Sequence, residues 1–241
     1  MVEEISLQGL ALGLLPVAAV IVIMLRWSAG AGTAIYATGR MLIQLLLIGY
    51  VLVFIFEAEH AAIIAAVLIV MLITASWIAI RPVARKQAHV FRNALIAISI
   101  GGILVLALVT QVVIAVDPWF NPRYVVPLAG MVFAGAMNSV SLAAERFESE
   151  IARNVSASEA RRIALSAALI PIINSLFAVG VVALPGMMTG QILSGISPLI
   201  AAKYQIVVMS MLFGVSGLSA ALYLQLQTRT LQPSDRSSAY D

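Results

Sequence analysis

The sequence predicts an all-α, polytopic membrane protein with seven transmembrane helices. Of its 241 residues, 62% are hydrophobic and only 10% are charged, and the mean hydropathy is +1.04. A soluble domain carries about a quarter charged residues, so this chain has too little polar surface to cover a water-soluble globule. Its apolar residues fall in seven runs, each of about the 20 residues that cross a hydrocarbon core.

The predicted spans follow one another through short connections. They lie at residues 7–25, 37–56, 61–80, 93–116, 124–144, 163–184 and 199–226. The first follows Glu3 and Glu4 rather than a basic segment, so we expect a retained span and not a signal peptide. Residues 185–198 hold two prolines and three glycines and form either an outer loop or a re-entrant turn. Residues 1–226 are thus the transmembrane domain, and 227–241 are expected to be a disordered cytoplasmic tail.

The connection at residues 145–162 is the one long hydrophilic segment between two spans. It holds 8 of the 25 charged residues, although the runs on both sides are uncharged. Ser156 and Glu159 have the spacing of a capping box, which predicts a helix that begins at Ala157 and leads into the sixth span. The alternative is an ordinary solvated loop whose serine caps a membrane helix.

The distribution of basic residues predicts the orientation. If the amino terminus lies outside the cell, 12 of the 14 Lys and Arg residues lie on the cytoplasmic side, and Arg123 and Lys203 lie near the outer side. Cytoplasmic loops of membrane proteins are enriched in Lys and Arg. We therefore expect the amino terminus outside, the carboxyl terminus inside, and residues 145–162 in the cytoplasm. The net charge of +3 is explained by this orientation rather than by nucleic-acid binding.

Several function classes are disfavoured by what the sequence lacks. The predicted spans have no ionisable residue in their interior, although proton-driven carriers usually need one. No HExxH, GxSxG or P-loop motif occurs, and the chain has no cysteine. We expect no enzyme and no catalytic residue here, so transport would need energy from a separate motor that docks on residues 145–162.

Three stretches carry a resemblance to a known family. They are residues 39–56 (GRMLIQLLLIGYVLVFIF), residues 126–147 with VPLAGM and MNSVSLAAERF, and residues 170–209 with LPGMMTGQIL followed by KYQIVV. The chain resembles the FetB-type ABC transporter permeases, which include bacterial iron exporters and the membrane subunit of a plant aluminium-tolerance transporter. The resemblance covers most of the chain from Gly39 onward.

The resemblance implies a multi-pass permease subunit of the cell inner membrane that exports iron or another metal species. It would pair with itself as a homodimer and with two copies of a cytoplasmic ABC ATPase, which would bind ATP and Mg; this chain would bind no cofactor. Residues 145–162 would be the coupling loop, with its contacts at Ser156, Ala157, Ser158, Glu159, Arg161 and Arg162. Here the loop lacks the Gly and Pro of the family's segment, and Ala134-Gly135 stands where many relatives have Gly-Asn.

Candidate residues for the substrate path are polar or sulfur-containing. They are Gln44, Met137, Asn138, Asn174, Met187 and Met188. The two asparagines either line a path for cations or make interhelical hydrogen bonds, and Ser175 is a weaker case of the same kind. Met187 and Met188 are either soft ligands beside a Pro-Gly break or adaptable packing. The ligands of a metal stay unknown at this stage.

Two other function classes remain open. A channel or carrier without a motor would move its substrate in liposomes without ATP. A membrane scaffold or sensor would produce no flux at all.

Overall fold

The structure is a computed structural model that describes residues 5–57, 60–83 and 87–235, with side chains described as far as residue 230. The predicted acidic start at Glu3 and Glu4, the basic pair Arg85 and Lys86, and residues 236–241 of the tail lie outside these ranges. Within them the regular structure is helical, apart from one isolated bridge between Val179 and Ala183. The chain divides into two compact units, Met1–Glu57 and Ala58–Asp241.

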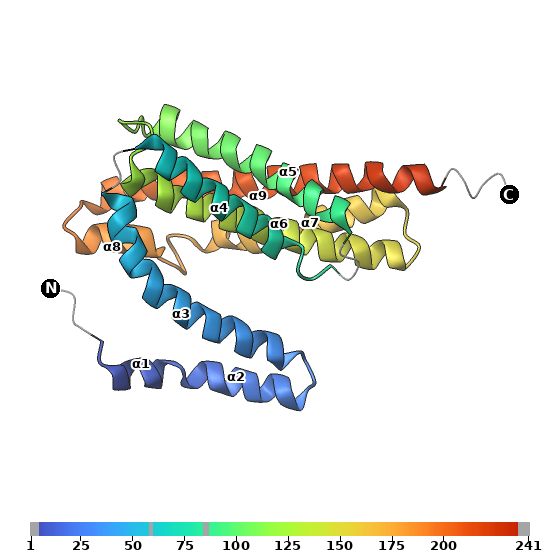
Figure 1. Cartoon of the computed structure of the whole chain (residues 1–241), viewed down its shortest axis with the longest axis horizontal. Helices are drawn as coiled ribbons and strands as arrows, with labels where there is room; N and C mark the ends of the chain where they lie inside the picture. Colours follow the sequence, from blue (N-terminus) through green and yellow to red (C-terminus); the bar gives the residue numbers. More distant parts are fainter. Residues whose placement is uncertain (1–4, 58–59, 84–86, 236–241) are drawn as a thin grey trace. The chain divides into compact units, whose positions relative to one another are not determined.

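The first unit holds the first two predicted spans (Figure 1). Its helices are α1 (Leu7–Gly13), α2 (Leu15–Arg26) and α3 (Ala31–Phe56). The predicted first span is divided at Leu14 because Pro16 stands in the first turn of α2, where its missing N–H costs no hydrogen bond. α3 begins six residues before the expected start at residue 37. Within it, the Gln44 amide oxygen can accept a hydrogen bond from Arg40 Nε at 3.1 Å.

The second unit contains the remaining helices (Figure 1). They are α4 (Ala61–Ala79), α5 (Ala88–Ala107) with the π-helix η1 (Leu108–Val113), α6 (Pro122–Ala152), α7 (Ala157–Ala178), α8 (Gly186–Leu193) and α9 (Pro198–Asp235). Together the described parts of the two units provide seven helical segments that are long and apolar enough to cross a membrane, which confirms the predicted fold class.

α6 is the central helix of the second unit and packs against α4, α5, α7 and α9. Its buried face alternates small residues with larger ones such as Val132 and Phe133, which are almost fully enclosed. α5 can come close because Gly101 and Gly102 have no side chains: a Cβ on Gly102 would lie 2.9 Å from Phe133 Cε1. The core of this unit is therefore built by close backbone approach rather than by large side chains.

The helices run further than the predicted spans at the charged end of this unit. α6 continues to Ala152 and α7 begins at Ala157, so the expected loop at 145–162 is helical except for a turn at residues 153–156. α9 continues to Asp235, where disorder was expected from Gln227 onward. The reason is burial, because Gln227 and Thr228 are each only 7% exposed and pack as part of the unit. Within residues 185–198, α8 is a short helix packed against α9.

Candidate functional site

The turn between α6 and α7 is closed by its backbone. α6 ends at Ala152, and the N–H groups of Arg153 and Val155 both donate to the Glu150 carbonyl, at 3.1 and 3.2 Å. Asn154 takes a left-handed conformation with φ of 61°. Asparagine tolerates this region better than other non-glycine residues, so it can end the helix here.

Glu150 is the charged residue that lies inside this turn. It is 5% exposed, and its Oε1 lies 2.7 Å from Arg146 Nη2 and 3.8 Å from Arg153 Nη1. The Arg153 side chain is largely exposed and that of Arg146 is partly buried, so the buried carboxylate has one partner that reaches well into water and one that is half-enclosed. The pairing holds the last turn of α6 against the connection to α7. The burial of Glu150 depends on tertiary packing and leaves no signal in the sequence.

The predicted start of α7 is confirmed, and the capping box is half formed. Ser156 is the N-cap residue, and its Oγ accepts from the Glu159 N–H at 3.4 Å. The Glu159 carboxylate instead accepts two hydrogen bonds from Arg162, at 2.9 and 2.6 Å. Ala157 begins the helix, and Ser158 Oγ lies 3.3 Å from Ser156 Oγ. The first turn of α7 is thus fixed by a cap and a bidentate ion pair, both exposed to solvent.

Arg161 connects this turn to α9. Its Nη1 donates to Gln225 Oε1 at 2.5 Å, across 64 positions of sequence. The contact is possible because Ala160, Ala164 and Ala168 form a nearly unexposed stripe of small side chains along α7. The turn is therefore joined to two long helices, covalently to α6 and by side-chain contact to α9.

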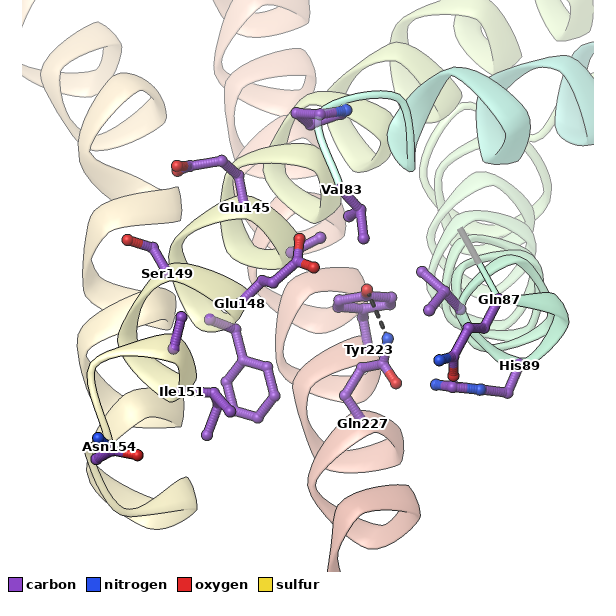
Figure 2. Close-up of a pocket in the computed structure, with 15 residues that line it drawn as sticks. Val83, Gln87, His89, Glu145, Glu148, Ser149, Ile151, Asn154, Tyr223 and Gln227 are labelled. Carbon is purple, nitrogen blue, oxygen red and sulfur yellow. Dashed lines mark hydrogen bonds between the residues drawn. The ribbon is translucent and has the colours of Figure 1, made fainter. Parts of the chain in front are cut away.

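A pocket of about 710 Å³ opens at the same end of the second unit (Figure 2). Its walls come from the α4–α5 connection, from the end of α6 with Glu145 and Glu148, and from α9. Tyr223 OH accepts from Gln227 Nε2 at 2.8 Å, and Gln227 Oε1 accepts from Asn93 Nδ2 at 3.1 Å. This buried chain of hydrogen bonds joins α5 to α9 at Gln227, within the stretch where the sequence predicts a tail.

A second pocket, of about 370 Å³, lies between α6, α7 and α9 within their apolar stretches. Asn138 lines it together with Ser139, Ser175 and Ser216, and Met131 contributes a thioether. Ala134 and Gly135 line it as well, beside Asn138. A Cβ on Gly135 would lie 3.3 Å from Leu212 Cδ2, so this glycine lets α9 pack closely.

The other predicted path residues do not join this pocket. Asn174 is exposed and does not line it, and Met137 packs beside the core. Met187 packs against the core and Met188 is half-buried in α8, while Gln44 belongs to the first unit. In the part of the chain that the structure describes, no group of three or more His, Cys, Asp or Glu side chains is placed to hold a metal ion.

The seven apolar helices and the charged turn at the end of two of them define a multi-pass integral membrane protein. The comparisons give its family. The chain belongs to the family described as "Uncharacterised protein family (UPF0014)", which matches residues 7–161 and 152–232. This confirms the resemblance found in the sequence.

Relatives of the chain match it over most of their length. A UPF0014 membrane protein of Synechocystis is 34% identical over 88% of this chain and 87% of its own. The "Probable iron export permease protein FetB" of Escherichia coli is 32% identical over 94% of this chain and 92% of its own. "Protein ALUMINUM SENSITIVE 3" of Arabidopsis thaliana is 32% identical over 78% and 73%. No solved structure matches the chain.

Proposed function

We propose that this chain is the permease subunit of an ABC transporter that exports iron or another metal species. The segment at residues 150–162 carries the proposal, because it is charged, its helix start is capped, and it connects α6 and α7 to each other and to α9. The name of the Escherichia coli relative, an iron export permease, supports the substrate class. Since the sequence holds no P-loop, ATP and Mg would bind to a separate cytoplasmic ATPase.

The arrangement of contacts suggests how force would pass. Closure of the ATPase pair around ATP would press on the exposed first turn of α7, at Ser158 and Arg162. The buried Glu150 would transmit this movement to α6, and Arg161 would transmit it through Gln225 to α9. These are the three helices that line the 370 Å³ pocket, so their tilt would open or close it.

The proposed assembly has two copies of this chain and two of the ATPase in the inner membrane. The amino terminus would lie outside, since 12 of the 14 basic residues then face the cytoplasm. In this orientation the α6–α7 turn and the 710 Å³ pocket are on the side where ATP is available.

The test is co-purification with an ATP-binding protein from native membranes. Reversing the charges at Arg161 and Arg162 should abolish it. The exchanged pair Glu159→Arg with Arg162→Glu serves as a control, because it keeps the ion pair while changing the surface that the ATPase meets. If the exchanged variant still co-purifies with the ATP-binding protein, the Glu159–Arg162 ion pair acts only by holding the start of α7. If the exchanged variant does not co-purify, the ATPase recognises the positions of the charges themselves.

The same preparation separates the other function classes. Metal flux from liposomes that contain this chain alone, without ATP, would indicate a channel or carrier. A chain that binds no ATPase and leaves the metal sensitivity of a deletion strain unchanged would be a scaffold or sensor. Either result would reject the proposal.

A further inference from the structure

The 370 Å³ pocket lies where a substrate would pass between the moving helices, and its lining is electrically neutral. Ser139 and Ser216 are 4% and 2% exposed and form its floor, while Asn138 and Ser175 lie at its open rim. Ser175 Oγ donates to the Pro171 carbonyl at 2.9 Å, which leaves its oxygen lone pairs free to accept. The volume falls within the range of pockets that hold small molecules.

Among the described residues, no Asp or Glu side chain lines this pocket. The nearest carboxylate along α6 is Glu145, which lies one turn beyond Leu142 and lines the other pocket. Residues 5–56 contain no Asp, Glu or His, and residues 61–80 contain none either. Neither of these apolar segments would therefore add a carboxylate to the lining if it covered the rim. A second copy facing the rim would add the same neutral groups.

A neutral lining is a poor site for a bare metal cation. Hard ions such as Fe³⁺ take anionic oxygen ligands, and an uncompensated ion pays a large desolvation cost inside the membrane. A single thioether from Met131 does not make a soft-metal site. The amide and hydroxyl groups of this lining can instead donate hydrogen bonds to the oxygen atoms on the surface of an organic chelator.

We propose that this pocket takes the metal as an oxygen-ligated chelate, whose anionic ligands offset the positive charge of the ion and present oxygens that accept hydrogen bonds, and not as a bare cation. The proposal rests on the metal export proposed above and narrows its substrate class. Asn138 would hold the chelate by hydrogen bonds from its amide, since it is the rim residue with both a donor and an acceptor group.

The test is binding of radioactive iron to the full chain in lipid nanodiscs. Iron is supplied either as ferric citrate or as Fe²⁺ kept reduced with ascorbate. The unaltered chain should bind ferric citrate and not Fe²⁺. Asn138→Ala should weaken citrate-complex binding roughly five- to tenfold, the loss expected for a hydrogen bond to a charged or polar ligand.

An isosteric change gives the sharper readout. Asn138→Asp adds a carboxylate to the pocket, so it should gain Fe²⁺ binding and lose ferric citrate. Asn174→Asp is the matched control: Asn174 is exposed on the same helix as Ser175 but does not line the pocket, so neither ligand should change.

Three results would overturn the chelate proposal: Fe²⁺ bound by the unaltered chain as tightly as the citrate complex, no binding of either form, or equal effects of the two aspartate variants. These results are separate from failure of the permease proposal. Co-purification of the ATPase together with Fe²⁺ binding would leave the permease intact and reject the chelate alone.

Discussion

Arg161 Nη1 donates to Gln225 Oε1 and so joins the first turn of α7 to α9, two elements that are far apart in sequence. A neutral amide accepts from the guanidinium, so the contact is a charge-assisted hydrogen bond and not a salt bridge. It can therefore break and re-form during movement at a lower cost than a buried ion pair would impose. This makes the pair the natural place to test coupling.

Removing either side of this contact should uncouple the proposed transporter. We expect Arg161→Ala and Gln225→Ala each to lower the metal exported per ATP hydrolysed, with ATPase association retained. The double variant should be no worse than the poorer single variant, because both remove one interaction. Export and hydrolysis measured together in proteoliposomes check this. Additive losses would show that the residues act separately.

Replacing Glu150 should destabilise the turn. Glu150→Ala leaves Arg146 without its partner and empties a buried position, while the partial exposure of Arg146 reduces the penalty. We expect a loss of about 1–2 kcal/mol, between the values for exposed and buried ion pairs. The shift in thermal unfolding midpoint in detergent measures it. Glu145→Gln, at an exposed position of the same helix, should change stability by less than about 0.5 kcal/mol.

Asn154 offers a test of the helix end. Because its φ is 61°, Asn154→Gly should keep or slightly raise stability, whereas Asn154→Val should cost about 1–2 kcal/mol. The same unfolding measurement applies. Equal stability of the glycine and valine variants would contradict the left-handed turn.

The helices can be predicted from the sequence because long apolar runs and a serine cap are local features. The start of α7 follows from Ser156 alone, since the cap needs only its own first turn. The extension of α9 could not be predicted in this way. Gln227 is polar, and it becomes part of the core only through Tyr223 on its own helix and Asn93 on α5.

The residues of the 370 Å³ pocket also divide into those that the sequence predicts and those that it does not. Asn138 was identified because a polar residue in an apolar run is conspicuous, yet Asn174 was equally conspicuous and does not line the pocket. Which of the two asparagines faces the pocket depends on how α6 and α7 are rotated about their own axes. A helix that is apolar on all sides has no sequence periodicity that would define this rotation. Ser139 and Ser216 were missed because serine is common in membrane helices and gives no pattern of its own.

The close approach of α5 to α6 and α9 gives the most direct test of the packing. Gly101→Ala would place a Cβ against Ser219, only 3.2 Å from its backbone nitrogen, and Gly102→Ala would place one 2.9 Å from Phe133 Cε1. Backbone cannot move aside as a side-chain tip can, so we expect Gly101→Ala to cost about 1–3 kcal/mol and to exceed the cost at Gly102. Gly217→Ala is the control, since its Cβ meets nothing within 4 Å and alanine favours the helix. Thermal unfolding in detergent ranks the three variants, and a Gly101→Ala chain as stable as Gly217→Ala would show that α5 and α9 are further apart than the structure places them.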